Sequence, residues 1–329
     1  LELTLLTGVF VLIGVASFGL TASGEKTGAR LGFSEALLGI VTALGADAPE
    51  ISSAISALLA GHHDLGIGVV LGSNVFNLAA LLGVSALVAG AVRPGRNGLL
   101  LDGGMALLVT LIGAGLIGGI LPPWLSAVLF GGLLVPYTWI SSLYPTHVQK
   151  MNIAAPVRNF LASALAEVRD DSKKNTPPPK ASLIDILALV PALFAIIAAS
   201  RGLVSASVSL SQRFHLPHAV VGLLIIAGLT GIPNMIAAVR LAARGRGAAV
   251  VTETFNSNTL NIVAGICLPA LIMGSLHASS RTIFVLWWLI GMTIATVAFA
   301  YWRNGIRRLG GVILLALYAA FAVTIIFWR

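Results

Sequence analysis

Charged residues are scarce in this sequence. Only 10% of its 329 residues are Asp, Glu, Lys or Arg, whereas 57% are hydrophobic and the mean hydropathy is +0.96. A soluble domain carries about a quarter charged residues, so the composition excludes an ordinary soluble fold and predicts several membrane-spanning helices. Cysteine is nearly absent too, since Cys267 is the only one, and a disulfide within the chain is therefore excluded.

Several functional motifs are also missing. The sequence has no Walker loop, nucleotide fingerprint or recognisable catalytic triad, so it gives no support to ATP-driven pumping, hydrolysis or other enzyme activity. A net charge of +8 suggests nucleic acid at first sight, but the basic residues lie in short loops between apolar runs. That distribution is a membrane-topology signal. The partners we expect are inorganic cations and the lipid bilayer, with no nucleic acid, no nucleotide and no cofactor besides a transported cation.

The apolar stretches predict an all-α membrane protein with ten transmembrane helices. A span needs about 20 mostly apolar residues. Residues 201–217 either extend the sixth span or form a short surface helix, and the first span is expected to be a membrane helix rather than a signal peptide because it lacks a basic leader. The ten predicted spans are 3–20, 33–61, 65–91, 99–121, 124–143, 183–200, 218–243, 248–274, 283–302 and 309–328.

Basic residues are distributed unevenly between the predicted loops. Sixteen of the 20 Lys and Arg residues fall in odd-numbered loops, and cytoplasmic loops carry such an excess. This places both termini outside and the loop 144–182 in the cytoplasm, in what we expect to be a prokaryotic cell (inner) membrane. The chain then divides into a first five-helix repeat (1–144), a polar, proline-rich cytoplasmic linker (145–182) and a second five-helix repeat (183–329).

Two polar motifs, 45–77 and 229–261, interrupt the apolar runs with the same spacing. An offset of 184 residues superimposes Pro49 on Pro233 without a gap. The same offset aligns Ser73 with Ser257, Asn74 with Asn258 and Asn77 with Asn261. Four matches at one offset, each in the second and third spans of a half, indicate an internal repeat.

Each predicted half has five spans, so the two halves enter the membrane from opposite sides. Transporters built from such inverted repeats bind their ions near the midplane, where the repeats meet and helices are broken. Pro49 and Pro233, with Gly45 and Gly231 upstream, are the expected break points. A helix broken there would expose carbonyl oxygens to a cation.

Three of the twelve acidic residues are predicted to lie at depth: Asp47, Glu50 and, with an entrance position equally open, Glu253. A charge at the bilayer centre costs on the order of 3 kcal/mol, and two acids three residues apart repel unless a cation or proton intervenes. A cation site is therefore the favoured interpretation. The alternative is a protonated pair, or a pair hydrogen-bonded to neighbouring helices. Asp102, by contrast, is predicted near a span end, within reach of water.

Neutral oxygen atoms flank these acids. Asn77 and Asn261 suit hard cations, although Asn also forms hydrogen bonds between membrane helices, the role expected of Asn74 and Asn258. Ser73 and Asn77 share one helix face, as do Glu253, Ser257 and Asn261. The sequence His62-His63-Asp64 resembles a metal site but more simply caps the outer turn between spans two and three.

The paired motifs resemble those of the calcium/cation antiporter superfamily, the sodium/calcium exchangers and their relatives. Their signature, Gly-Thr/Ser-Ser-x-Pro-Glu followed by Gly-Ser-Asn-x-x-Asn/Asp, is matched by Gly45-Ala46-Asp47-Ala48-Pro49-Glu50 and Gly72-Ser73-Asn74-Val75-Phe76-Asn77 in the first half, and by Thr230-Gly231-Ile232-Pro233-Asn234 and Asn256-Ser257-Asn258-Thr259-Leu260-Asn261 in the second. Ten predicted spans, an outside N-terminus and a cytoplasmic central loop also resemble that family, and we expect a secondary antiporter with alternating access.

This sequence also departs from the family pattern. Asn234 stands where these exchangers usually have a second glutamate, Asn261 where they often have aspartate, and Asp47 where serine is common. We expect Asp47 and Glu50 to carry the cation, with support from Ser73, Asn77, Thr230, Asn234, Ser257 and Asn261, and with Glu253 either in the site or at its entrance.

The expected function is exchange of a divalent cation, calcium first, for protons or sodium. Protons gain weight because few acids are present to hold several sodium ions. A monovalent cation/proton antiporter on the same fold, and a non-transporting scaffold or sensor with a degenerate second repeat, remain alternatives.

Overall fold

The computed structural model describes residues 2–30, 35–172, 182–274, 276 and 278–328, and these residues are mostly helical. Two short strands pair antiparallel, with Ala91 opposite Arg307. The elements are α1 (Glu2–Arg30), α2 (Glu35–Leu59), α3 (His63–Asn77), the π-helical segment η1 (Leu78–Val84), α4 (Ser85–Ala89), β1 (Ala91–Val92), α5 (Arg96–Ile117), α6 (Pro123–Ser142), α7 (Pro145–Val148), α8 (Ala155–Ser172), α9 (Leu183–Arg213), α10 (His218–Val220), η2 (Val221–Ile226), α11 (Ala227–Ala243), α12 (Gly247–Ile262), η3 (Val263–Cys267), α13 (Leu268–Met273), α14 (Ser280–Trp302), β2 (Ile306–Arg307) and α15 (Arg308–Phe327).

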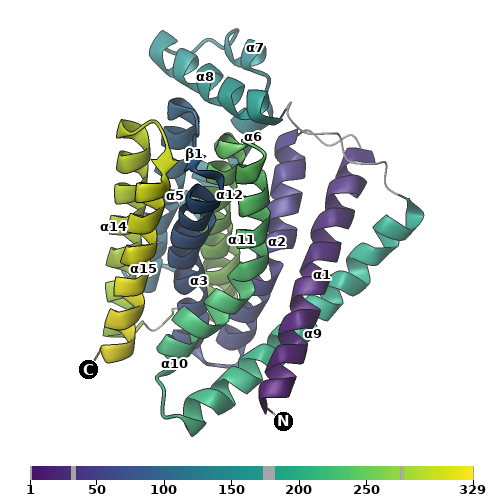
Figure 1. The fold of residues 1–329 in the computed structure, drawn as a ribbon, viewed down its shortest axis with the longest axis vertical. Coiled ribbons are helices and arrows are strands. Elements are labelled where there is room, and N and C mark those ends of the chain that lie inside the picture. Colours follow the sequence, from purple (N-terminus) through teal and green to yellow (C-terminus); the bar gives the residue numbers. More distant parts are fainter. Residues whose placement is uncertain (1, 31–34, 173–181, 275, 277, 329) are drawn as a thin grey trace.

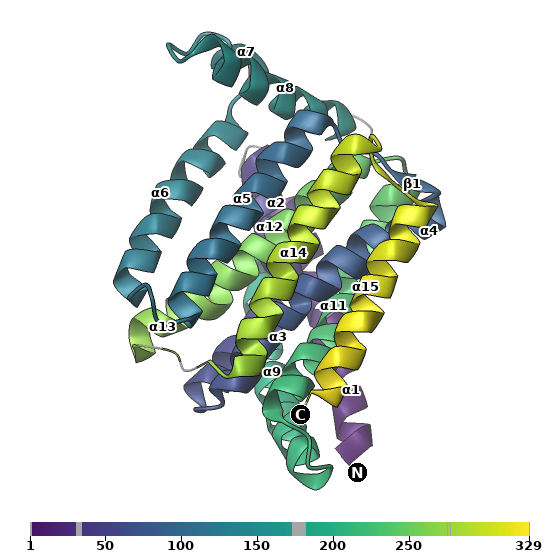
Figure 2. The same cartoon turned by 90° about the vertical axis from the view of Figure 1, so that its left-hand side faces the viewer.

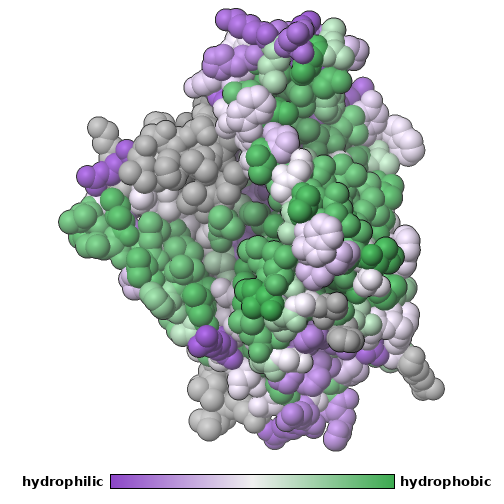
Figure 3. All heavy atoms as spheres, turned by 180° about the vertical axis from the view of Figure 1, so that it is seen from behind, coloured by the Kyte–Doolittle hydropathy of each residue, from purple (hydrophilic) through white to green (hydrophobic). Residues whose placement is uncertain are grey.

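Nine helical stretches among the described residues are long and apolar enough to cross a membrane. They correspond to nine of the ten predicted spans, and α9 runs to Arg213, so residues 201–213 extend the sixth span. The remaining predicted span is α2, whose 25 residues reach about 37 Å at a rise of 1.5 Å per residue. One face of the molecule shows an apolar belt between polar ends, as contact with lipid requires (Figure 3).

The helices surround a central group formed by α2, α3, α11 and α12. The long helices α1 and α9 lie against each other and against α2 on one side of it (Figure 1). On another side, α6, α5, α14 and α15 stand in a row (Figure 2). The apolar faces of α3, η1 and η2 fill the core, where Leu71, Leu78 and Val221 are fully buried.

Both proline-containing motif helices are continuous, which corrects the predicted helix breaks. Pro49 lies inside α2 and Pro233 inside α11. A proline in a helix leaves the carbonyl four residues earlier without its usual partner. In α2 that carbonyl belongs to Gly45, and it accepts a hydrogen bond from Ser17 Oγ of α1 at 3.0 Å. The freed oxygen is thus satisfied by a neighbouring helix, and the helical interruptions lie instead in the π-helical segments.

The 184-residue offset found in the sequence recurs in the backbone. Gly61 and Gly245, which precede α3 and α12, have φ of +83° and +72°, and Gly90 and Gly274, which follow α4 and α13, have φ of +84° and +87°. This left-handed region is open to glycine at little cost. The segments η1 and η3 also follow α3 and α12 in the same way. The two halves therefore share a local backbone pattern as well as a polar motif.

Close helix contact depends on glycine where α3 crosses η2. A Cβ atom at Gly72 would overlap the backbone of Leu223, and one at Gly222 would overlap that of Leu65. Small residues permit this approach between membrane helices. The backbones cannot separate without disturbing the central group, because α3 and η2 are both in its core.

Gly72→Ala is therefore expected to lower the free energy of unfolding by about 1–3 kcal/mol, the usual cost of overpacking. Gly104→Ala is the matched control, since a Cβ there meets nothing within 4 Å and alanine favours the helix by about 1 kcal/mol. Thermal unfolding of both variants in detergent measures the difference. Equal melting temperatures would show that the crossing tolerates a wider separation.

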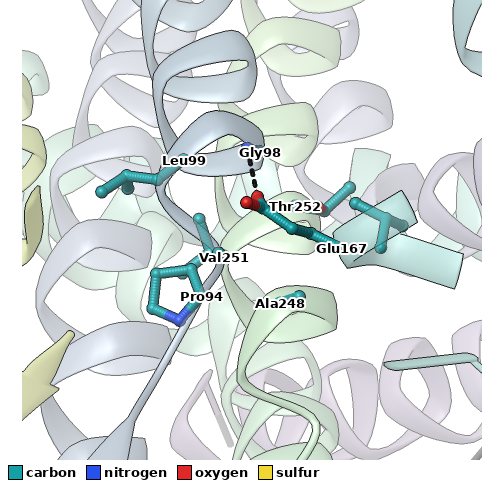
Figure 4. A pocket seen from close by; sticks show the side chains of 9 residues that line it. Pro94, Gly98, Leu99, Glu167, Ala248, Val251 and Thr252 are labelled. Carbon is teal, nitrogen blue, oxygen red and sulfur yellow. Dashed lines mark hydrogen bonds between the residues drawn. The ribbon is translucent and has the colours of Figure 1, made fainter. Parts of the chain in front are cut away.

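The helix α8 covers the ends of α5 and α6. Its buried Leu161 and Leu165 pack with Val148, and Glu167 Oε2 accepts the backbone N–H of Gly98 in the first turn of α5 at 2.8 Å (Figure 4). A carboxylate at a helix N-terminus satisfies a free N–H and complements the helix dipole. Both termini lie at the opposite end of the molecule (Figure 1). Residues 173–181 of the predicted linker lie outside the described residues.

Candidate cation site

Asp47 and Glu50 lie on one face of α2, and neither has any exposed surface. Asp47 Oδ1 accepts hydrogen bonds from Asn234 Nδ2 of α11, at 2.8 Å, and from Ser257 Oγ of α12. Glu50 is one helical turn further on, close enough to Asp47 for their charges to repel. An acid of the first half is thus held directly by both motif helices of the second half.

Four asparagines join α3 to α12 through a reciprocal set of hydrogen bonds. Asn74 Nδ2 donates to the carbonyl of Asn258 at 3.0 Å, and Asn258 Nδ2 donates to that of Asn74 at 3.1 Å. Asn77 Nδ2 donates to Asn258 Oδ1, and Asn261 Nδ2 donates to Asn74 Oδ1, each at 3.1 Å. Every bond has its counterpart 184 residues away. The interhelical role predicted for Asn74 and Asn258 is confirmed.

The same hydrogen bonds leave oxygen atoms unused. The amide nitrogens of Asn77 and Asn261 donate hydrogen bonds to the opposite helix. Their amide oxygens have no donor among the described residues. Further unpartnered oxygens belong to the acids and to Ser73. Among the described residues, the buried unpartnered oxygens of the predicted site are Asp47 Oδ2, Glu50 Oε1 and Oε2, Ser73 Oγ, Asn77 Oδ1, Asn234 Oδ1, Glu253 Oε2 and Asn261 Oδ1.

Such a concentration of unused oxygen is costly in a protein without a ligand. A buried polar group without a partner costs about 1–3 kcal/mol, and more when it is charged. Carboxylate and amide oxygens are the ligands of hard cations, so the residues present fit a cation. No three His, Cys, Asp or Glu side chains converge among the described residues. The donor set is therefore two carboxylates surrounded by neutral oxygens.

Two predicted ligands stand apart from this set. The hydroxyl of Thr230 is buried and donates to the carbonyl of Ile226 in its own helix at 2.9 Å, so its proton is not directed at Asp47. Glu253 is half-buried in the second turn of α12, between the charges of Asp47 and Arg246. It lies one turn from Ser257 on the same face. Both the site role and the entrance role predicted for Glu253 are compatible with this position.

One neighbour of the acids was not foreseen from the sequence. Ser53 is fully buried on α2 and its hydroxyl has no partner among the described residues. It follows Glu50 by three residues, just as Glu50 follows Asp47. That repeated spacing on one helix face was the available signal.

The prediction that Asp102 reaches water is wrong. Only 5% of Asp102 is exposed, because α6 and α12 close over this part of α5. Tyr137 Oη of α6 lies 2.9 Å from Asp102 Oδ1 and 3.0 Å from Asn256 Oδ1, and Thr252 Oγ1 of α12 donates to Asp102 Oδ2 at 2.6 Å. Thr252 and Asn256 flank Glu253 and Ser257 along α12. Asp102 thus ties the helix that carries site residues to the row formed by α5 and α6.

Asp102→Ala is expected to lower the free energy of unfolding by about 1–3 kcal/mol for each hydroxyl that loses its acceptor. It should also weaken cation binding, since α12 loses an anchor beside Ser257. Asp102→Asn keeps an acceptor oxygen for Thr252 and should have a smaller effect on both. Thermal unfolding and cation-binding titrations of the two variants check this. Thr110→Val on α5 is the control, because among the described residues Thr110 bonds within its own helix, to the carbonyl of Ala106. Equal losses in both Asp102 variants would contradict the anchoring role.

Comparison with known sequences places this geometry in a family. The profile of the family described as sodium/calcium exchanger protein matches residues 1–143 and 184–327. The chain belongs to this family. Both matched segments contain a motif of the candidate site, and the family is one of ion exchangers rather than enzymes. The chain is accordingly an integral membrane protein.

Individual relatives are similar to this chain over most of their length. The putative antiporter CaxA of Alkalimonas amylolytica is 26% identical over 266 residues, which is 79% of each chain. The sodium/calcium exchanger MaX1 of Methanosarcina acetivorans is 24% identical, over 99% of this chain and 98% of its own.

Solved structures share the fold. The crystal structure of an H⁺/Ca²⁺ exchanger, CAX, superimposes with a TM-score of 0.74 at 17% identity, covering 98% of this chain and 82% of that one. The sodium-calcium exchanger NCX_Mj, soaked with Na⁺ and Sr²⁺, gives a TM-score of 0.63 at 19% identity, covering 100% and 99%. At these identities the likeness shows that the exchanger fold is common to the three chains.

Proposed function

We propose that this protein is a secondary-active antiporter that exchanges a divalent cation, with calcium the first choice, for protons or sodium. The observation that carries the proposal is the buried pair Asp47 and Glu50, with unpartnered carboxylate and amide oxygens around it. Membership of the exchanger family supports it. The names of relatives supply both counter-ions, since CAX is an H⁺/Ca²⁺ exchanger and MaX1 a sodium/calcium exchanger.

Charge balance favours a divalent cation exchanged for protons. Two carboxylates neutralise one Ca²⁺, and they are equally neutralised by two protons, so the site stays electrically balanced in both loaded states. Exchange for several sodium ions needs more negative charge or more sites. The second half offers Gly231 and Asn234 at the positions that correspond to Asp47 and Glu50, so it adds no acid there.

The arrangement of the two halves supports alternating access. Asp47 contacts α11 and α12 through Asn234 and Ser257, so the ion site spans the boundary between the halves. Relative movement of the halves then opens the site to one face or the other. We propose ten spans, with α2 as the tenth, arranged as two inverted repeats of five.

A monovalent cation/proton antiporter is the second candidate. The observation in its favour is the neutral side chain of Asn234, which lowers the charge available to a divalent ion. The two candidates differ in which gradients drive flux. We suggest reconstituting the purified protein in proteoliposomes and measuring radioactive calcium uptake under a pH gradient without sodium, then under a sodium gradient without a pH difference.

Each outcome of this assay is informative. Calcium uptake driven by either gradient supports the proposal and identifies the counter-ion. Sodium or potassium flux against protons without calcium transport supports the second candidate. No flux of any of these ions, from protein that still unfolds cooperatively, would leave a non-transporting scaffold or sensor.

The proposed topology places both termini outside a prokaryotic cell membrane and α8 in the cytoplasm. It rests on the excess of Lys and Arg in loops that lie at the α8 end. In a Cys267→Ala background, Arg213→Cys is expected to react with an impermeant maleimide added to intact cells, whereas Arg244→Cys reacts only after the membrane is permeabilised. The reverse pattern would invert the orientation without changing the site.

A further inference from the structure

A hollow of about 350 Å³ opens at the end of the molecule opposite α8. It is lined by Gly61, His62, His63, Asp64 and His218. His62 belongs to the turn between α2 and α3 in the first half, and His218 begins α10 in the second half. Their imidazole rings lie together, with centroids 5.3 Å apart and planes inclined by 30°.

These two histidines have no evident structural role. His62 occupies the N-cap position of α3 but makes no side-chain capping bond, so the predicted capping role is wrong for this residue. His218 Nδ1 is buried without a hydrogen-bond partner among the described residues. Asp64 behaves differently, because its Oδ1 accepts both the N–H of Ser279 and the hydroxyl of Thr282 at 3.3 Å. Asp64 thus anchors the first turn of α14, a structural role that His62 and His218 do not share.

The ring geometry suits a transition-metal ion. A metal bound about 2.1 Å from one nitrogen of each ring at a tetrahedral angle places the ring centroids about 5 Å apart, close to the spacing of His62 and His218. Imidazole is a ligand for Zn²⁺, Cu²⁺ and Ni²⁺, whereas the oxygens around Asp47 suit calcium or magnesium. No third His, Cys, Asp or Glu completes a cluster among the described residues, so a metal held by these two rings would take water as its remaining ligands.

We propose that His62 and His218 form a binding site for a transition-metal ion such as Ni²⁺, Cu²⁺ or Zn²⁺. The two ligands come from different halves, so the metal links the α2–α3 turn to the start of α10. This binding is independent of the proposed function.

The binding test uses protein purified through a tag that contains no histidine. Ni²⁺ is titrated calorimetrically into wild type, His62→Gln and His218→Gln, with His147→Gln near α8 and Glu50→Gln at the candidate cation site as controls. Each hollow variant is expected to raise the Kd at least about tenfold, equivalent to the loss of about 1.4 kcal/mol, and both controls should bind as wild type does. Electron paramagnetic resonance of bound Cu²⁺ should show coupling to two imidazole nitrogens, reduced to one in either variant.

Unchanged Ni²⁺ affinity in both hollow variants would overturn the site. A spectrum of bound Cu²⁺ that keeps the same imidazole coupling in His62→Gln and His218→Gln would overturn it as well. Neither readout requires transport, so absence of cation flux in proteoliposomes would contradict the proposed function and leave the binding result standing.

Discussion

Glu50→Gln is expected to abolish cation exchange while the protein remains folded. Glu50 has no exposed surface, and neither of its carboxylate oxygens has a partner among the described residues. Glutamine keeps the shape of the side chain but removes the charge that balances the cation. Loss of a charged ligand worth about 3 kcal/mol corresponds to roughly a 100-fold loss of affinity. Flux in proteoliposomes and cation binding in detergent measure the two effects.

The matched control is Glu167→Gln, the same chemical change at a carboxylate of α8 that binds the first turn of α5. Its side-chain oxygen can still accept the N–H of Gly98, so exchange should persist. Glu50→Gln should also melt at or above the wild-type temperature, because removing an unbalanced buried charge relieves repulsion with Asp47. Normal transport by folded Glu50→Gln would move the site elsewhere in the molecule.

Cation uptake is expected to be driven by a pH gradient without sodium and inhibited by acid on the side from which the cation enters. Asp47 and Glu50 bind a metal only when deprotonated, so protons and metal compete for the same oxygens. Vesicles that are acidic inside should therefore accumulate calcium as protons leave. Acidifying the outside should slow uptake and raise the apparent KM for calcium. The measurement is initial uptake across a series of external pH values at fixed internal pH.

A variant of the second half tests the origin of this proton coupling. Asn234 Nδ2 lies 2.8 Å from Asp47 Oδ1, so Asn234→Glu places a second carboxylate against Asp47. Like charges at this distance require a cation between them. The variant should bind divalent cations more tightly or respond to a sodium gradient. Wild-type uptake that follows only the sodium gradient would contradict proton coupling and favour sodium exchange.

Much of the fold follows from composition and spacing. Twenty-residue apolar runs must be helical in lipid, where each backbone polar group needs an internal partner. Nine of the predicted spans correspond to described helices that are long and apolar enough to cross a membrane, and the tenth corresponds to α2. The predicted breaks at Pro49 and Pro233 are wrong, because proline removes one hydrogen bond without always ending a helix. The outcome depends on what satisfies the freed carbonyl, and for Gly45 that is Ser17, a residue of α1 that no local pattern connects to it.

The candidate site, like the fold, was determined partly by the sequence and partly by tertiary packing. The sequence by itself determined the pairing of the two motifs, because an ungapped offset of 184 residues places chemically equivalent side chains at equivalent helical positions. Tertiary structure alone decided which atoms are used up in holding the helices together. Asn74 and Asn258 bond across the interface through main chain and side chain, whereas Asn77 and Asn261 keep their oxygens unpaired.

Asp102 shows that the burial of a polar side chain also depends on tertiary packing. Its place near a span end indicated access to water, since sequence distance from a helix terminus measures depth along one helix. Burial depends on what lies beside the helix, and here Tyr137 and Thr252 arrive from α6 and α12. The sequence determined where polar groups occur along each helix, and the packing of helices far apart in the chain decided which of them find a hydrogen-bond partner among the described residues and which do not.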